Sequence, residues 1–240
     1  MKEDWDLLFL QQARNEDLKT LVDILTHDTN GEIRISEQLT NTDAYLYCYP
    51  NRLNRMWKEI AGELQHYGGN TLMNLYRGKG VAYREILEDV CRKMHVSLYD
   101  WENTVTLEKR LLKKICHEVV VHMSEKELRD LAVQLNIENK NPQKYMLVFA
   151  LQIAIKKGGI LFTRLALYIT QMITKALLGC GLSFFGANVI CKTLGLLGGP
   201  IGWVATIGWS MIDLASPAYR VTIPAVLQVS CMRMYQFNKE

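Results

Sequence analysis

One stretch of the sequence distinguishes this chain from an ordinary helical protein: residues 176–212 read ALLGCGLSFFGANVICKTLGLLGGPIGWVATIGWSMI. Its only charged residue is Lys192, which separates uncharged runs at 176–191 and 193–212. The second run has 20 residues, and a helix of that length spans about 30 Å, the thickness of the hydrocarbon core of a bilayer. We therefore expect this stretch to bury itself against a membrane or another apolar surface.

Small residues recur every four positions in this stretch, from 179 to 195, and the pattern continues at 198 and 202. Such spacing lets two helices approach closely, and it predicts a glycine-rich helical hairpin that turns near residues 196–202. Two tryptophans could lie at a membrane interface. The residues that we predict to contact membrane or a partner are Gly179, Ser183, Ala187, Cys191, Gly195, Gly198, Gly202, Trp203 and Trp209.

The hairpin has more than one interpretation. It inserts into or lies on a membrane, or it is a buried hairpin of a soluble protein, in which glycine also permits close packing. A binding surface for an apolar client is a third interpretation. The preceding residues 160–178 contain Arg164 and Lys175, so they favour an amphipathic helix at an interface over a clean membrane span.

The distribution of charge divides the chain. Residues 1–157 contain 22 Lys/Arg and 23 Asp/Glu, whereas residues 158–240 contain 6 and 2. With helix signals this predicts a short helix–turn–helix module at 1–40, a central helical module at 41–157 and a charge-poor hydrophobic helical region at 158–240. The net charge of +3 and the lack of a basic run argue against a nucleic-acid partner.

The pattern of apolar residues and helix-capping signals predicts an all-α fold, since no stretch alternates as a strand would. Expected helices occupy residues 104–121, 125–136 and 160–178, with a capping box at Ser124. The remaining boundary signals are Asn15 as an N-cap, Pro50 opening a helix that ends at Gly68 and Gly69, a helix beginning near Ser36, another beginning at Pro142, and a last one beginning at residues 222–224.

The N-terminus is acidic and has no apolar segment, so we expect no cleaved signal peptide. The six cysteines are scattered and form no CxxC pair, a pattern typical of reduced, mostly buried thiols. We therefore expect a cytoplasmic protein, peripheral or integral at the cytoplasmic membrane if the hairpin binds lipid.

The loop of residues 26–37 has the spacing of an EF-hand, which needs alternating oxygen ligands, a central glycine and a final glutamate. The glycine is Gly31, but position 1 is Thr26 where aspartate is usual, and position 9 is Arg34. The alternative is a capped turn between two helices that binds no metal. The candidate Ca²⁺ ligands are Asp28, Asn30, Glu32 and Glu37.

Other candidate sites are weaker. Gly78, Lys79 and Gly80 precede a helix and could bind an anion through backbone N–H groups, although they form no P-loop. His117 and His122 are five residues apart, too far around a helix to share a metal ion. The sequence nominates no nucleophile or general base, so we expect no enzyme and no bound cofactor other than a candidate Ca²⁺.

Several strings resemble the YaaW-like family of bacterial proteins: DLLFL at 6–10, LTHD at 25–28, IAGELQHYGGN at 60–70, RGKGVAYREIL at 77–87 and YRVTIPAVLQ at 219–228. This family is remotely related to ubiquinol–cytochrome c chaperone domains, which are helical and assist assembly of a membrane complex. The resemblance implies helices and a chaperone-like role beside a membrane, but it implies no catalytic residues.

Together these observations favour a non-enzymatic, chaperone-like assembly or interaction protein that associates with membrane lipid or an apolar protein client through its C-terminal hydrophobic helices. One alternative is a pore-forming or membrane-perturbing protein with a buried hairpin that inserts on a trigger. Another is a calcium-responsive helical protein. The sequence leaves the client, the lipid and the oligomeric state open.

Overall fold

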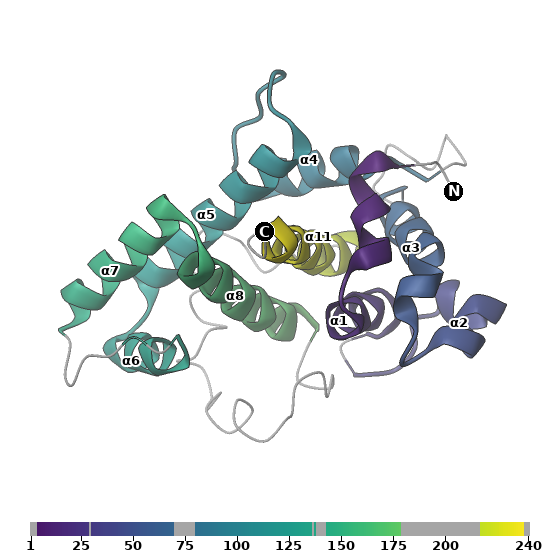
Figure 1. The fold of residues 1–240 in the computed structure, drawn as a ribbon, viewed down its shortest axis with the longest axis horizontal. Helices are drawn as coiled ribbons and strands as arrows, with labels where there is room; N and C mark the ends of the chain where they lie inside the picture. The colour runs from purple at the N-terminus through teal and green to yellow at the C-terminus, as the bar shows by residue number, and fades with distance from the viewer. Residues whose placement is uncertain are drawn as a thin grey trace.

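The computed structural model describes residues 4–28, 30–69, 80–135, 137, 143–178 and 217–237. These residues form α-helices and short 3-10 helices, and their one β-type feature is an isolated antiparallel bridge between His27 and Ile33. The predicted all-α class is confirmed (Figure 1). The elements are η1 (Trp5–Gln12), α1 (Asn15–Thr26), η2 (Leu39–Asn41), α2 (Asp43–Cys48), η3 (Leu53–Met56), α3 (Trp57–Gly69), α4 (Tyr83–Lys93), α5 (Thr104–His122), α6 (Glu125–Gln134), α7 (Lys144–Lys157), α8 (Ile160–Leu178) and α11 (Pro217–Phe237).

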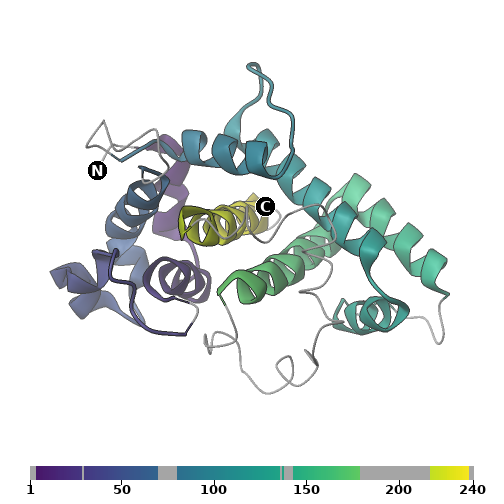
Figure 2. The ribbon, with the colours of Figure 1, turned by 180° about the vertical axis from the view of Figure 1, so that it is seen from behind.

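The C-terminal helix α11 lies in the middle of the molecule, and the other helices surround it (Figure 1, Figure 2). It packs against α1, α3, α4, α5 and α8. Every residue from 221 to 234 is buried, so the helix has no solvent-facing side along most of its length. A helix buried all round holds its neighbours by removing apolar surface from water on every face.

The described helices share one hydrophobic core. Its buried residues come from η1 and α1 near the N-terminus, from α3 to α6, and from α7, α8 and α11. The described part of residues 158–240 is therefore packed onto the rest of this chain, and α11 contacts α1 directly. The division into three segments stays a prediction. Described residues of all three contribute to the common core.

The chain turns sharply between α7 and α8. Gly158 and Gly159 have φ angles of +80° and +82°, a region that glycine adopts without strain and other residues rarely do. The helix axes differ by 107°. Among the described helices, none alone has the length and apolar composition of a membrane span, and only α7 taken together with residues Ile160–Thr174 passes that test, as a bent pair.

The predicted role of Asn15 as an N-cap is wrong. The helix begins at Asn15, and Arg14 is the N-cap without a side-chain bond. Asn15 instead contacts the chain before α3: its Oδ1 accepts the backbone N–H of Leu53 at 2.9 Å, and its Nδ2 donates to the carbonyl of Pro50 at 2.7 Å. A tertiary contact thus uses the polar groups that would otherwise cap the helix.

The predicted starts of two helices also need correction. The residues after Pro50 do not open an α-helix directly, since a 3-10 helix from Leu53 precedes α3. The last helix begins at Pro217 and continues through Pro224, although proline removes one helical hydrogen bond. Packing of α11 against five helices offsets that loss, which local sequence rules do not include.

Candidate functional site

Several predicted site residues lie outside the described part of the chain. They are Gly78, Lys79, Gly179, Ser183, Ala187, Cys191, Gly195, Gly198, Gly202, Trp203 and Trp209. The small-residue hairpin and the pore-forming alternative that depends on it stay predictions. The four described cysteines, Cys48, Cys91, Cys116 and Cys231, are buried and free, as expected for these positions.

The candidate calcium loop is a tight turn closed by its own hydrogen bonds. Oδ1 of Asp28 accepts the backbone N–H groups of Asn30 at 2.8 Å and Glu32 at 3.0 Å, and these bonds lower the pKa of the Asp28 carboxyl. The flanking residues His27 and Ile33 pair as an antiparallel bridge. The loop, which connects α1 to η2, therefore closes on itself in a hairpin-like turn.

The last candidate ligand, Glu37, points into the protein. Its Oε2 accepts the backbone N–H of Thr40 at 2.9 Å, and its Oε1 accepts the Thr40 hydroxyl. No helix begins at Ser36: the 3-10 helix η2 begins at Leu39, and the separate helix α2 begins at Asp43 after the extended residue Thr42. Among the described residues, no group of three or more His, Cys, Asp or Glu side chains could hold a metal. Calcium binding stays a prediction.

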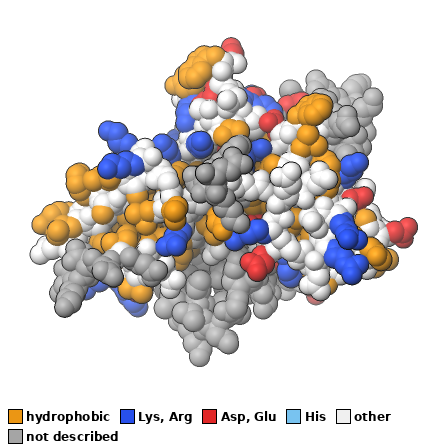
Figure 3. Space-filling view, in the orientation of Figure 1, with side chains coloured by type: hydrophobic (Ala, Val, Ile, Leu, Met, Phe, Trp, Pro, Cys, Tyr) orange, Lys and Arg blue, Asp and Glu red, His pale blue; other side chains and the backbone are white. Residues whose placement is uncertain are grey.

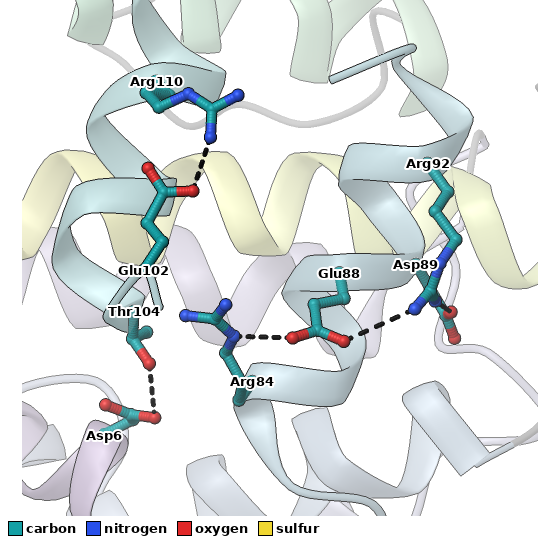
Figure 4. A network of polar contacts seen from close by, with 8 residues as sticks. All are labelled: Asp6, Arg84, Glu88, Asp89, Arg92, Glu102, Thr104 and Arg110. Atoms are coloured by element: carbon teal, nitrogen blue, oxygen red, sulfur yellow. Dashed lines mark hydrogen bonds and ion pairs between the residues drawn. The ribbon is translucent and has the colours of Figure 1, made fainter. Parts of the chain in front are cut away.

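A pocket of about 660 Å³ lies between α4, the start of α5 and Asp6 of η1. Several of its charged side chains have polar partners (Figure 4). Glu88 binds Arg84 at 2.7 Å and Arg92 at 3.4 Å, and Thr104 donates to Asp6 at 2.8 Å. Since none of its described lining residues is a histidine, cysteine or serine, the pocket offers no histidine base and no cysteine or serine nucleophile among them.

One more pair holds the loop that borders this pocket. Arg110 of α5 binds the buried carboxylate of Glu102 at 2.5 Å and donates to the carbonyl of Ser97 at 2.9 Å. Its guanidinium also lies 4.5 Å from the centre of the Tyr99 ring. These contacts fix the 94–103 connection against α5, and Figure 4 shows the pair of Arg110 with Glu102. The pair of Arg110 with Glu102 thus has a structural role.

The core contains a cluster of three polar side chains, here called the central polar cluster: Tyr83, Glu108 and Arg233. The Tyr83 hydroxyl donates to Oε1 of Glu108 at 2.7 Å, and Nε of Arg233 donates to Oε2 at 2.7 Å. Burial raises the pKa of the Glu108 carboxyl, and the Arg233 guanidinium opposes that increase. Arg233 also donates to the carbonyl of Asp6 and lies 4.2 Å from the centre of the Phe9 ring. The cluster therefore joins α4, α5, α11 and the N-terminal segment.

Glu63 is a buried carboxylate in a smaller pocket of about 300 Å³. Its Oε1 accepts the backbone N–H of Gln38 at 3.2 Å. Burial, with a contribution from nearby Glu37, raises the pKa of Glu63 to about 7. Glu59 and Gly80 line the same pocket, so carboxylates lie beside the one described residue of the anion candidate. Their charge disfavours an anion there, and anion binding stays a prediction.

Large apolar side chains lie exposed on α7 and at the start of α8. We call this surface the α7 face: Tyr145, Met146, Phe149, Ile153 and Ile160. Tyr145 is 69% exposed, Phe149 64% and Ile160 65%. Residues four apart on a helix lie on one side of it, so the α7 members form one stripe. Figure 3 shows hydrophobic side chains gathered over the end of the molecule where α7 lies.

Sequence reasoning identified the helix that carries the α7 face but not the face itself. The segment 144–157 reads KYMLVFALQIAIKK, and both sides of that helix are apolar. The inner side, including Leu147 and Leu151, is buried, where α7 packs on α5 and α6. The signal available in the sequence was that apolar residues cover more of this helix's circumference than one buried stripe would.

Comparisons with known proteins agree with the earlier resemblance. A family model described as "Ubiquinol-cytochrome C chaperone" matches residues 53–227, and a model described as "Domain of unknown function (DUF3944)" matches residues 1–35. Residues 1–35 contain η1 and α1, which pack against helices within residues 53–227. No solved structure matches the chain.

Two relatives cover nearly the whole chain. A UPF0174 protein of Helicobacter pylori (strain J99) is 37% identical over 234 residues, which are 97% of this chain and 92% of the relative. The UPF0174 protein YaaW of Escherichia coli (strain K12) is 31% identical over 234 residues, 96% of this chain and 94% of the relative. The predicted membership is confirmed: this chain belongs to the UPF0174 (YaaW) family and carries a ubiquinol–cytochrome c chaperone-like domain.

Proposed function

We propose that this protein is a non-enzymatic, chaperone-like interaction protein that binds apolar surfaces through the α7 face. The observation that carries the proposal is the exposure of Tyr145 and Phe149, which lie on the same side of one helix. Isolated apolar residues on a surface are ordinary, but a contiguous patch marks an interaction site. Aromatic side chains are also enriched where proteins meet partners.

The α7 face is held on a rigid support. Leu147 and Leu151 anchor α7 to the core, and the buried side of α8, including Phe162 and Leu165, packs against α11. The exposed side chains can therefore meet a partner without unfolding of the helices that carry them. The description of the matching family model as a chaperone supports the same conclusion.

An aggregation assay tests this function. Insulin whose disulfides are reduced exposes apolar chains and scatters light as it aggregates. We expect the wild-type protein to delay this scattering, and the variant with Tyr145→Ser and Phe149→Ser to lose most of that effect. The matched control carries Leu46→Ser and Tyr47→Ser, which remove two exposed apolar residues from α2. Equal activity of both variants, or no activity in the wild type, would contradict the proposal.

A further inference from the structure

The α7 face has cationic neighbours and no acidic ones on its own helices. Lys144 begins α7, while Lys156 and Lys157 end it, and all three are exposed. Arg164 on the first turns of α8 is exposed as well. The sequence contains no Asp or Glu from residue 143 to residue 178. The exposed apolar stripe is therefore bounded at both ends by positive charge.

The bend at Gly158 and Gly159 determines how this surface is presented. Because α7 and α8 meet at 107°, α8 turns into the core while the outer side of α7 remains at the surface (Figure 1). Lys113 of α5 also donates to the carbonyl of Lys156 at 3.2 Å, which adds a cation near the bend. The outcome is a helix that lies along the surface with its apolar stripe outward.

This combination matches a membrane surface. Helices that lie in the interface bury an apolar stripe among the acyl chains and place Lys and Arg near the headgroups. Tyr145 has the amphipathic ring that favours the headgroup level. An anionic surface attracts each nearby Lys or Arg enough to raise affinity about fivefold.

We propose that the α7 face docks α7 flat on an anionic phospholipid bilayer, with Tyr145 and Phe149 inserted and Lys156 and Lys157 at the headgroups. This inference rests on the proposed function, because it names the apolar surface that the α7 face binds. The helices that anchor α7 stay packed in the core. The protein therefore binds at the periphery of the membrane through this surface.

Flotation of the full chain with vesicles tests the proposal. One set of vesicles is pure phosphatidylcholine, and the other contains about 30% phosphatidylglycerol. We expect wild-type protein to float with the anionic vesicles and to bind the neutral ones at least tenfold more weakly. Raising salt to about 0.5 M should weaken anionic binding, since the Debye length falls to a few Å. Equal binding to both compositions would overturn the anionic assignment.

Variants locate the binding surface. Lys156→Gln with Lys157→Gln should reduce binding to anionic vesicles by about 25-fold, at about fivefold for each charge. Tyr145→Ser with Phe149→Ser should reduce it to a similar extent or further. The control with Leu46→Ser and Tyr47→Ser should float like wild type. All variants change exposed side chains, and circular dichroism verifies that they fold.

The outcomes separate this inference from the proposed function. Protection of insulin without vesicle binding would overturn the membrane proposal and leave the proposed function standing. Vesicle binding that the α7 variants retain would overturn the membrane proposal too, because another segment would then carry it. Failure of both assays in the wild type would overturn both.

Discussion

The helices α11 and α7 reverse the usual distribution of side chains. In α11 the polar residues Gln228, Ser230 and Arg233 are buried in the centre of the molecule, whereas in α7 the aromatic residues Tyr145 and Phe149 are exposed. Hydrophobicity alone would place these residues the other way round. The difference teaches that burial in this protein follows from the partners that surrounding helices supply.

Each of those α11 side chains has a hydrogen-bond acceptor nearby. Gln228 donates to the carbonyl of Asp17 at 3.2 Å, and Ser230 donates to the carbonyl of Val226 at 2.7 Å. Arg233 binds Glu108 at 2.7 Å. A buried polar group that keeps its hydrogen bonds costs little, while one that loses its partner costs the full desolvation free energy. The exposed stripe of α7 has no comparable structural explanation, which is why we assign it a function.

The largest expected effect comes from removing the carboxylate of the central polar cluster. Glu108→Ala leaves Arg233 buried without its counterion, and breaking a buried ion pair in this way costs about 3–5 kcal/mol. We expect the free energy of unfolding, measured by urea denaturation, to fall by that amount. The double variant Glu108→Leu with Arg233→Met should recover most of the loss, because it leaves no unpaired charge. A loss below about 1 kcal/mol for Glu108→Ala would show that the cluster is not essential.

The second prediction concerns Glu63, a buried carboxylate whose partner is a backbone N–H group, whereas the partner of Glu108 is a cation. The pKa of Glu63 is raised to about 7 in the folded protein from an ordinary 4.5. A raised pKa means that the folded state binds the proton more tightly. The stability contributed by the protonated form is then complete below pH 4.5 and is lost as the pH rises through about 7. We expect the free energy of unfolding to decrease by up to about 3 kcal/mol across this window.

The measurement is urea denaturation of wild type and Glu63→Gln at several pH values between 4.5 and 8. The glutamine keeps an oxygen for the N–H of Gln38 and carries no charge, so the variant should lose this pH dependence. It should also be more stable than wild type at pH 8. Identical pH profiles for both proteins would contradict the raised pKa.

A smaller effect concerns the support of the α7 face. Ser124 and Glu127 form a capping box at the start of α6, and α6 packs against α7. Loss of an N-cap by Ser124→Ala typically costs about 1 kcal/mol. We expect a decrease of that size in thermal or urea denaturation, with faster amide exchange in α6. Ser124→Thr keeps a hydroxyl that both accepts from the Glu127 N–H and donates to its carboxylate, so it should behave like wild type; an equal loss in that control would assign the effect to something other than the cap.

The smallest effect should come from the exposed side of α7. Phe149→Ser should change the free energy of unfolding by no more than about 0.5 kcal/mol, because the ring is already in contact with water. Leu151 lies on the other side of the same helix and is fully buried, so Leu151→Ala should cost about 2–5 kcal/mol. Urea denaturation of the two variants gives the contrast directly. A large destabilisation by Phe149→Ser would mean that the ring supports the fold.

Local signals predicted much of the fold. The capping box at Ser124 is confirmed, the helix over residues 160–178 has the predicted bounds, and the chain turns at Gly158 as expected. These features depend on hydrogen bonds and dihedral preferences between residues that are close in sequence. Such interactions act on the chain before any tertiary contact forms.

The errors occur where distant residues compete with local signals. Asn15 binds the backbone at Pro50 and Leu53 in place of capping its own helix, and Pro224 lies inside a helix that packing stabilises. The candidate site depends on the same kind of information. An apolar helix such as α7 shows in its sequence that it has two apolar sides, but not which side the core will cover.

The sequence by itself determined the all-α class, several helix bounds, the membership of the family and the charge-poor character of the C-terminal third. Only the tertiary structure decided that α11 occupies the centre, that Glu108 and Arg233 meet across 125 residues of chain, and that Phe149 remains exposed. The physical reason is that local hydrogen bonding is encoded within a few neighbouring residues. Burial depends on which surfaces far apart in the chain come into contact.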